Sequence, residues 1–330
     1  MTVKLSLCMI IKNEEEYLPA CLESVRHVAD EIIIVDTGST DSSRNKALQF
    51  GARVIDHEWQ NDFSRARNLS IENACGDWIL VLDADEELES GSGDKIRKLI
   101  ECTDGDGFEL TVESEMPETD IIAFDRIKIL RLFRNKKEFR YALPIHEQIR
   151  PSIEKSGGKI LDSELVILHH GYARKTVQGG VNRAARNLDL LQIGLSISPN
   201  DPYLIYQVGA TLMSAGKHVE AQAELRRVLE MEYSKLPTVI LDKLFMKLSQ
   251  LALEMNDNKM AVKFAEDSLQ YNPSNTISKY VLAIALLSAE RIADGYQILL
   301  TIQAGRDLNI RLGKQLDHLL TACRTVLGPG

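Results

Sequence analysis

Short apolar runs and helix-like patterns alternate along the first part of the chain. The apolar runs predict strands over residues 3–11, 31–35, 53–56 and 78–82. Between them, apolar residues recur at helical spacing and predict helices over residues 17–25, 42–50 and 65–74. The run 78–82 is unbroken, as expected for a strand buried on both faces of a parallel sheet. Strand–helix alternations of this kind predict a parallel α/β layer.

The pattern changes after Glu86. Further strands with polar turns between them are predicted over residues 108–112, 121–124, 127–133 and 159–169. From Arg174 onward strand patterns disappear and helices dominate, beginning with a predicted helix over residues 174–197. Two domains are therefore expected, an α/β domain at residues 1–175 and an all-α domain at residues 176–330.

Small residues recur at a nearly constant interval in the second half. Ala261 and Gly295 are 34 residues apart, which is the period of the tetratricopeptide helix-turn-helix repeat. Ala221 and Ala261 are 40 residues apart, so an insertion is expected near residues 233–237. About three degenerate repeats are predicted. They would form a groove for an extended peptide, a contact with a second copy of the chain in a homodimer, or a rigid brace for the first domain.

Composition narrows the function classes. The net charge of −9 argues against a general nucleic-acid binder, which needs clustered Lys and Arg. The five cysteines are scattered without CxxC spacing, so neither a zinc site nor a disulfide framework is expected. The apolar run at residues 5–11 is interrupted at once by charged residues, and no stretch has the length of a membrane-spanning helix. We therefore expect a cytoplasmic protein without an integral membrane segment.

Polar residues gather where the predicted strands end. Asp36 follows the second strand, and four carboxylates lie within residues 83–87, directly after the fourth. Since open α/β sheets place ligands outside the carboxyl ends of their strands, these loops are expected to converge. Asp83 and Asp85 would face a divalent cation there; the alternative is a solvated acidic loop.

Four segments of the first half carry a further signal: Ile10-Ile11-Lys12-Asn13-Glu14-Glu15, Val35-Asp36-Thr37-Gly38-Ser39-Thr40-Asp41, Ala66-Arg67-Asn68 and Leu82-Asp83-Ala84-Asp85-Glu86. In this order they resemble the successive motifs of family 2-type glycosyltransferases with the GT-A fold. The resemblance covers about residues 1–175. It implies a GT-A (nucleotide-diphospho-sugar transferase) domain that binds a UDP-sugar, with Mn²⁺ or Mg²⁺ held by a DxD motif.

The resemblance also implies roles for single residues. Six positions would form the donor site: Lys12, Asn13, Asp36, Arg67, Asn68 and Asp83. Among them, Asp36 would contact the nucleoside, with Lys12 and Asn13 lining its pocket. Arg67 and Asn68 would flank the uracil and the diphosphate, Asp83 would touch the ribose or sugar, and Asp85 would ligate the metal. Thr37 departs from the many family members that carry a second acid at that place.

Histidines mark two places in the middle of the chain. His146-Glu147 follows a proline-bearing turn, which is typical of an exposed active-site loop, and His169-His170 ends a later apolar run. Structural histidines remain the alternative for both. By resemblance, His146 and Glu147 lie near the acceptor and the transferred sugar. The second motif supplies a metal or diphosphate contact, for which the match favours His169 over His170.

A base must take the proton of the attacking acceptor. Glu147 is the leading candidate and His146 the second. Arg131 and Arg134 would either solvate an edge strand or bind a diphosphate.

The sequence thus predicts a metal-dependent inverting glycosyltransferase that moves a sugar from a UDP-sugar to a protein, peptide or glycan acceptor. One alternative is a scaffold that binds a peptide through its repeats beside a degenerate sugar-nucleotide fold. A nucleotidyltransferase is a second alternative, but the loop after the first strand lacks the glycine-rich, arginine-bearing sequence usual in that class.

Overall fold

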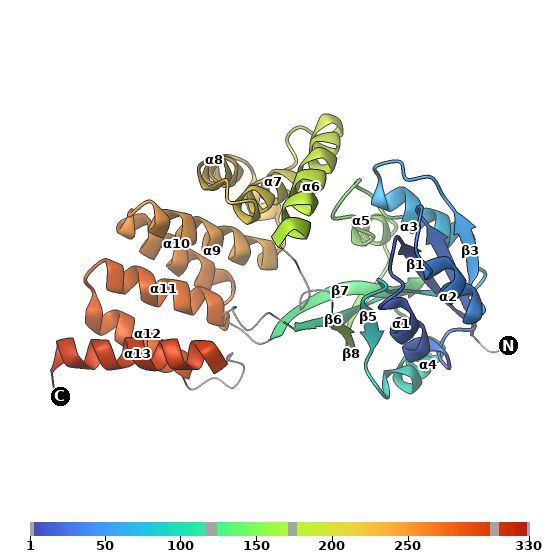
Figure 1. Cartoon of the computed structure of the whole chain (residues 1–330), viewed down its shortest axis with the longest axis horizontal. Coiled ribbons are helices and arrows are strands. Elements are labelled where there is room, and N and C mark those ends of the chain that lie inside the picture. The colour runs from blue at the N-terminus through green and yellow to red at the C-terminus, as the bar shows by residue number, and fades with distance from the viewer. Residues whose placement is uncertain (1–2, 116–123, 171–176, 304–309, 329–330) are drawn as a thin grey trace. The chain divides into compact units, whose positions relative to one another are not determined.

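The computed structural model describes residues 3–115, 124–170, 177–303 and 310–328 (Figure 1). These residues divide into two compact units, an α/β unit up to residue 170 and a helical unit from residue 177 onward. The predicted domain boundary at residue 175 lies outside the described residues and stays a prediction. Among the described helices, none combines the length and the apolar character that crossing a lipid bilayer requires.

An eight-stranded mixed sheet forms the centre of the α/β unit, in the order β3-β2-β1-β4-β7-β6-β8-β5. Its strands are β1 Leu5–Ile11, β2 Glu31–Asp36, β3 Arg53–Asp56, β4 Trp78–Val81, β5 Glu86–Leu88, β6 Gly107–Glu115, β7 Phe124–Arg134 and β8 Ile160–His169. The first four strands run parallel, and β7 joins them antiparallel to β4. The predicted α/β layer is therefore confirmed.

Two strand predictions need correction. Separate strands over residues 121–124 and 127–133 are wrong, because Phe124 belongs to the same continuous strand, β7, as residues 127–133. Residues 121–123 lie outside the described residues. The short strand β5 was not predicted, because three residues directly after an acidic loop give no periodicity to detect. It pairs antiparallel with β8, so that Glu86 lies opposite His169.

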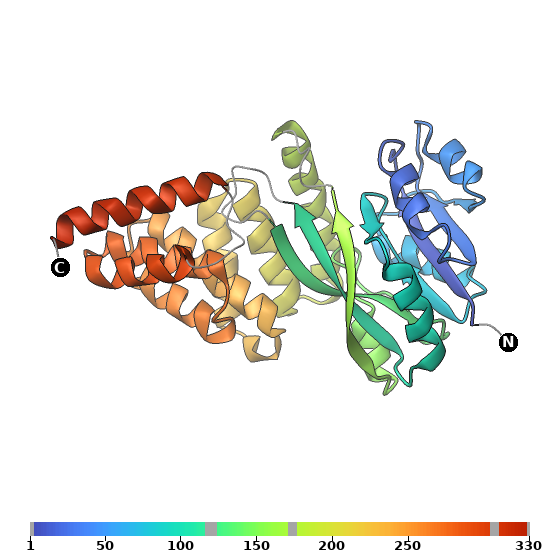
Figure 2. The ribbon, with the colours of Figure 1, turned by 90° about the horizontal axis from the view of Figure 1, so that it is seen from below.

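Five helices cover the two faces of this sheet: α1 Leu18–Val25, α2 Ser43–Gln49, α3 Phe63–Glu72, α4 Ser92–Cys102 and α5 Arg150–Lys155. Alternate residues of each strand point to opposite faces. Leu7 and Leu80 belong to the core shared with α1, α2 and α4, whereas Cys8 and Ile79 belong to the core shared with α3 and α5. Figure 2 looks onto the face covered by α1 and α4. The strand β4 is buried on both faces, as predicted.

The helix α3 begins two residues before its predicted start. The carboxylate of Asp62 accepts a hydrogen bond from the backbone N–H of Arg65 at 3.0 Å and caps the first turn. This cap sets the start of the helix that carries Arg67 and Asn68.

The helical unit consists of α6 Val177–Ile197, α7 Pro202–Ser214, α8 His218–Leu229, α9 Thr238–Glu254, α10 Asn258–Tyr271, α11 Thr276–Ser288, α12 Ile292–Gln303 and α13 Ile310–Leu327. The helices α7 and α8, α9 and α10, and α11 and α12 pack as consecutive pairs. The longer connection between α8 and α9 contains a 3₁₀ turn at Tyr233–Lys235, where the insertion was predicted. The helix predicted over residues 174–197 is observed from residue 177; residues 174–176 lie outside the described residues.

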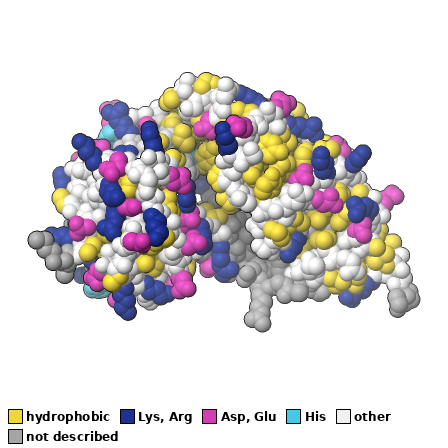
Figure 3. All heavy atoms as spheres, turned by 180° about the vertical axis from the view of Figure 1, so that it is seen from behind, with side chains coloured by type: hydrophobic (Ala, Val, Ile, Leu, Met, Phe, Trp, Pro, Cys, Tyr) yellow, Lys and Arg dark blue, Asp and Glu magenta, His cyan; other side chains and the backbone are white. Residues whose placement is uncertain are grey.

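Small residues allow the helices of a pair to approach closely. A Cβ atom on Gly209 would lie 2.6 Å from the side chain of Leu225, and one on Gly295 would lie 2.9 Å from Leu287. In the pair between them, Ser249 Oγ donates to the carbonyl of Ala261 at 2.7 Å. The prediction of three helix pairs with small residues at their crossings is confirmed. On the face in Figure 3, acidic and basic side chains are interspersed over the described surface.

Candidate active site

The predicted site loops meet at one edge of the sheet. Because β2, β1 and β4 are parallel neighbours in that order, Asp36, Lys12-Asn13 and Asp83 follow them at the same end. Neighbouring strands lie roughly 5 Å apart, so the ends of β2 and β4 are separated by about 10 Å. Lys12-Asn13 lies between them.

Backbone-directed hydrogen bonds join the loops after β1 and β2. Asp36 is buried, and its Oδ1 accepts from the backbone N–H groups of Gly38 and Ser39 at 3.1 and 2.8 Å. Asn13, with φ at +58°, accepts the Thr40 N–H on its side-chain oxygen at 2.7 Å. Lys12 is exposed, and no ion pair of its ammonium is found within the described residues. These loops form a hydrogen-bonded rim at the ends of β1 and β2.

Thr37, which stands where many family members carry an acid, serves this rim. Its Oγ1 and its backbone N–H both lie 3.0 Å from the carbonyl oxygen of Ile11. Thr37 is 7% exposed. The hydroxyl therefore ties β2 to β1.

Two arginines hold Asp83 from opposite sides. Arg67 Nη2 donates to Asp83 Oδ1 at 2.7 Å, and Arg131 Nη2 donates to Oδ2 at 3.0 Å. Although burial works in the opposite direction, the two guanidinium groups keep the pKa of Asp83 well below its ordinary value. Asp83 is thus a fixed carboxylate at the tip of β4.

Glu86 connects the acidic turn to Arg131. It is 3% exposed, and its carboxylate accepts from Arg131 Nη2 at 2.6 Å and from the backbone N–H of Asp83 at 2.9 Å. Burial raises the pKa of Glu86 to about 7, against the opposing charge of Arg131. The Glu86 side chain therefore holds both the backbone of the acidic turn and the guanidinium group of Arg131.

Asp85 faces His169. Asp85 Oδ2 lies 3.3 Å from His169 Nε2, and His169 Nδ1 shares a hydrogen bond of 2.9 Å with Ser114 Oγ. Burial opposes a charge on the imidazole, but the hydrogen bond and charge of Asp85 outweigh it and raise the pKa of His169. His170 pairs instead with Glu87 at 3.2 Å. Gly171 and Tyr172, which complete the predicted motif, lie outside the described residues.

The loop that carries His146 and Glu147 is strained and firmly anchored. Ala142 and Gln148 close it by an antiparallel bridge, and Leu143 and His146 adopt φ of +81° and +53°. Such backbone strain in residues other than glycine clusters at functional sites. Burial lowers the pKa of His146 and keeps the imidazole neutral, although the charge of Glu147 acts the other way.

The α3 helix holds this loop by its backbone and by one side chain. The N–H of Phe63 donates to the carbonyl of Pro144 at 2.9 Å, and Ser64 Oγ donates to the carbonyl of Leu143. Arg67 Nε donates to Glu147 Oε1 at 2.5 Å. Glu147 is thereby connected through Arg67 to Asp83.

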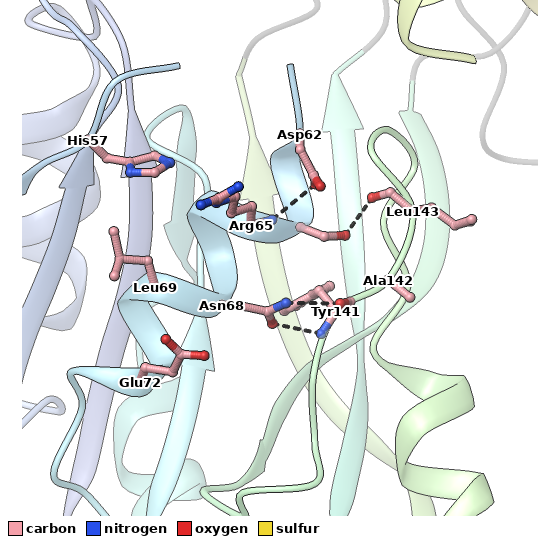
Figure 4. Close-up of a pocket in the computed structure, with 10 residues that line it drawn as sticks. His57, Asp62, Arg65, Asn68, Leu69, Glu72, Tyr141, Ala142 and Leu143 are labelled. Atoms are coloured by element: carbon pink, nitrogen blue, oxygen red, sulfur yellow. Dashed lines mark hydrogen bonds between the residues drawn. The ribbon is translucent and has the colours of Figure 1, made fainter. Parts of the chain in front are cut away.

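Asn68 contacts the protein backbone with both ends of its amide. Its Nδ2 donates to the carbonyl of Tyr141 at 3.0 Å, and its Oδ1 accepts the Tyr141 N–H at 2.8 Å. Figure 4 shows this pair beside a cavity of about 640 Å³. The cavity is lined by His57, Asp62, Ser64, Arg65, Asn68, Leu69, Glu72, Tyr141, Ala142 and Leu143. The acidic residues at the strand ends do not line it.

Sequence reasoning missed Glu86, Ser114 and the placement of Arg131. The edge-strand interpretation of the arginines is wrong, because β7 lies between β4 and β6 inside the sheet. Arg131 is 7% exposed and faces Asp83, while Arg134 stacks 4.7 Å from the Trp78 ring centre. An arginine inside the apolar run 129–133 was the available signal, because a buried strand tolerates a charge only when that charge is paired.

Comparisons with known proteins agree with this geometry. Residues 6–144 match the family described as glycosyl transferase family 2. A TPR repeat-containing protein of Synechococcus elongatus is 36% identical over 69% of this chain and 57% of its own length. The glycosyltransferase SunS of Bacillus subtilis is 27% identical over 66% of this chain and 51% of its own length. The chain spans about half the length of these curated relatives.

A solved structure of residues 1–349 of TarS from S. aureus, in complex with UDP-GlcNAc, covers 84% of this chain and 91% of its own. The TM-score of 0.44 and the identity of 10% are too low to inform on a ligand of this chain.

The mixed sheet with its acidic strand tip, the family match and the helix pairs confirm the predicted order of a GT-A domain followed by helical repeats. Residues 6–144 thus form a domain that matches the predicted class of enzyme, glycosyl transferase family 2, and helix pairs of the tetratricopeptide type follow it.

Proposed function

We propose that the chain transfers a sugar from a UDP-sugar to a protein, peptide or glycan acceptor, with inversion at the anomeric carbon and with Mn²⁺ or Mg²⁺ bound. The observation that carries this proposal is the convergence of Asp36, Asp83 and Asp85 at one sheet edge, with Glu147 joined to Asp83 through Arg67. Strand ends of this kind are where open α/β sheets bind nucleotides.

The donor would lie along the edge from β2 to β4. Asp36, Lys12 and Asn13 would receive the nucleoside, because they form the rim at the β1 and β2 ends. Lys12 is exposed and carries a positive charge that suits a diphosphate. In this arrangement Asn68 and Arg67 shape the pocket from behind, since Asn68 is bonded to the Tyr141 backbone and Arg67 uses Nη2 and Nε for Asp83 and Glu147.

The residues present fit a divalent cation beside Asp85. Its carboxylate and the Nε2 of His169 are close enough to bind one ion together, and Ser114 orients the ring through Nδ1. Within the described residues, no group of three or more His, Cys, Asp or Glu side chains is arranged to hold a metal. The remaining ligands would therefore come from the diphosphate and water. A cation bound there would stabilise negative charge on the leaving diphosphate.

Glu147 would take the proton of the attacking acceptor. Its Oε1 is held by Arg67, so Oε2 is the oxygen left to act as base. His146, neutral and next to it, is the second candidate. Attack from the side opposite the diphosphate would invert the anomeric centre. The helical repeats would present the acceptor or a second copy of the chain.

A panel of UDP-sugars incubated with the protein and Mn²⁺ tests this proposal. We expect UDP release from at least one sugar, abolished by chelation and by Asp85→Asn. Asp162→Asn is the matched control, because this exposed aspartate pairs with Lys128 away from the strand ends and should leave turnover unchanged. UDP release that is insensitive to chelation and to Asp85→Asn would refute the metal role. No release and no UDP binding would favour the scaffold hypothesis.

A further inference from the structure

A chain of alternating charges runs through the α/β unit. Its members come from five segments and are, in order, Glu86, Arg131, Asp83, Arg67 and Glu147. Each consecutive pair is joined by a hydrogen-bonded ion pair of 2.5 to 3.0 Å. The chain therefore connects the acidic turn after β4 with the loop that carries the candidate base.

Stability alone is a poor explanation for this arrangement. Arg67 and Arg131 are each 7% exposed. Burying charges costs solvation free energy, and well-packed apolar residues in place of such pairs are often as stable or more stable. Arg67 Nη1 and Arg131 Nε are buried without a hydrogen-bond partner among the described residues. A purely structural cluster would leave fewer donors unpaired.

Arg67 is the member that spans the two halves of the site. One guanidinium group uses Nε for Glu147 and Nη2 for Asp83, so its rigid fork sets the distance and orientation between the two carboxylates. The backbone of the loop is held separately by Phe63 and Ser64. Loss of the Arg67 side chain would therefore release the Glu147 carboxylate while these backbone contacts remain.

We propose that Arg67 is a positioning residue for the base rather than a contact of the nucleotide. It fixes the position of the Glu147 carboxylate relative to Asp83. The base therefore lies at a defined distance from a donor bound at the strand ends. This role rests on the proposed function, because it requires Glu147 to be the base. An Arg67→Lys substitution would keep the positive charge but lose the two fixed donor directions of the guanidinium group. It would therefore not restore the position of Glu147 relative to Asp83.

A double-mutant cycle on Arg67→Met and Glu147→Gln tests this role. UDP affinity is measured by calorimetry with Mn²⁺, and turnover by hydrolysis of the UDP-sugar that the wild type accepts best. We expect each single variant to lose about 10²-fold or more in kcat, the loss typical of a missing or misplaced base, with UDP affinity changed less than about threefold. The double variant should be no slower than Glu147→Gln, because Arg67 acts through Glu147. Arg67→Lys should resemble Arg67→Met.

Arg53→Met is the matched control. Arg53 is exposed at the start of β3, where it donates to Asn73, and the variant should match the wild type in both measurements. UDP affinity weakened about tenfold or more in Arg67→Met, with losses that multiply in the double variant, would overturn the role and make Arg67 a donor contact. A wild type that neither binds UDP nor hydrolyses any UDP-sugar would refute the proposed function, and this role with it.

Discussion

The two units of this chain bury charge in opposite ways. In the helical unit, Asp242 is 1% exposed and lies among neutral donors, the side chains of Ser268, Ser278, Asn272 and Asn275 at 2.6 to 3.2 Å. In the α/β unit, buried arginines meet the buried Glu86 and the part-buried Asp83 and Glu147, and polar atoms remain without a partner among the described residues.

Those unpartnered atoms all lie in one unit. Across the described residues, every buried side-chain nitrogen or oxygen without a hydrogen-bond partner belongs to the α/β unit, among them Arg67 Nη1, Arg131 Nε and His146 Nε2. A satisfied buried carboxylate such as Asp242 specifies how helices pack. The charged cluster at the strand ends, in contrast, keeps two arginine nitrogens without a partner among the described residues. This difference separates the structural polar network from the candidate site.

The largest expected effect concerns Asp85. Asp85→Asn keeps the size of the side chain but removes the charge that faces His169, so metal-dependent turnover should fall by about 10²-fold or more. The melting temperature should hardly change, because Asp85 is partly exposed. Turnover at different Mn²⁺ concentrations measures the effect. Unchanged turnover would remove Asp85 from the site.

The second effect distinguishes the two kinds of buried charge. Asp242→Ala leaves several buried donors unpaired and should lower the free energy of unfolding by about 3 kcal/mol, with UDP affinity unchanged. Chemical denaturation and calorimetry measure the two quantities. A loss of UDP affinity without a loss of stability would contradict a structural role for the hydrogen-bond network around Asp242.

Substitution of Arg131 alone should lower the stability more than substitution of Arg131 together with Glu86. Arg131→Met leaves Glu86 buried without its counter-charge and should cost about 3 kcal/mol of stability. Combining it with Glu86→Leu should restore most of that stability, because an apolar pair avoids the desolvation cost. Turnover should remain low in both. Recovery of turnover together with stability would show that this part of the chain of charges only supports the fold.

Gly209→Ala probes the helix packing that the small-residue repeat predicts. The new methyl group would lie 2.6 Å from the Leu225 side chain, so Leu225 or the helix that carries it must shift, at a cost of about 1–3 kcal/mol. Gly313→Ala is the control, because no atom lies within 4 Å of the added carbon. Denaturation midpoints of the two variants should differ clearly, and equal midpoints would contradict the close crossing.

The smallest effect is the pH dependence that His146 contributes. Burial depresses its pKa below the ordinary 6.5, so the unfolded chain binds the proton more strongly. The contribution of His146 to stability is therefore intact above pH about 6.5 and declines as the pH falls through that value toward the lower folded-state pKa. His146→Gln should flatten stability against pH in this window, measured with a chelator present. The pKa of His169 is raised, so its contribution to stability depends on pH in the opposite direction. That contribution is present in both proteins, and the difference between the variant and the wild type therefore reports His146.

The sequence predicted the parts that depend on local patterns. Apolar runs and strand-end carboxylates were sufficient for β1 to β4 and for the shared edge of Asp36 and Asp83, because parallel strands must end on the same side. The small residues at the helix crossings were predicted by their period.

Contacts between distant segments were beyond sequence reasoning. Arg67 and Glu147 are 80 residues apart, and Arg131 and Glu86 are 45 apart. No local pattern shows which of several arginines faces a given carboxylate. Asn68 shows the same limit, because its bonds to Tyr141 depend on how the later loop returns to α3.

Calorimetric titration of UDP in the presence of Mn²⁺ tests the central claim most directly, by comparing the wild type with Asp36→Ala, Asp85→Asn and Asp242→Asn. We expect wild-type binding that depends on the metal. Asp36→Ala should weaken it, Asp85→Asn should remove the dependence on the metal, and Asp242→Asn should leave it unchanged. Equal UDP affinity in all four proteins, or none in any, would contradict a donor site at the carboxyl edge of the sheet.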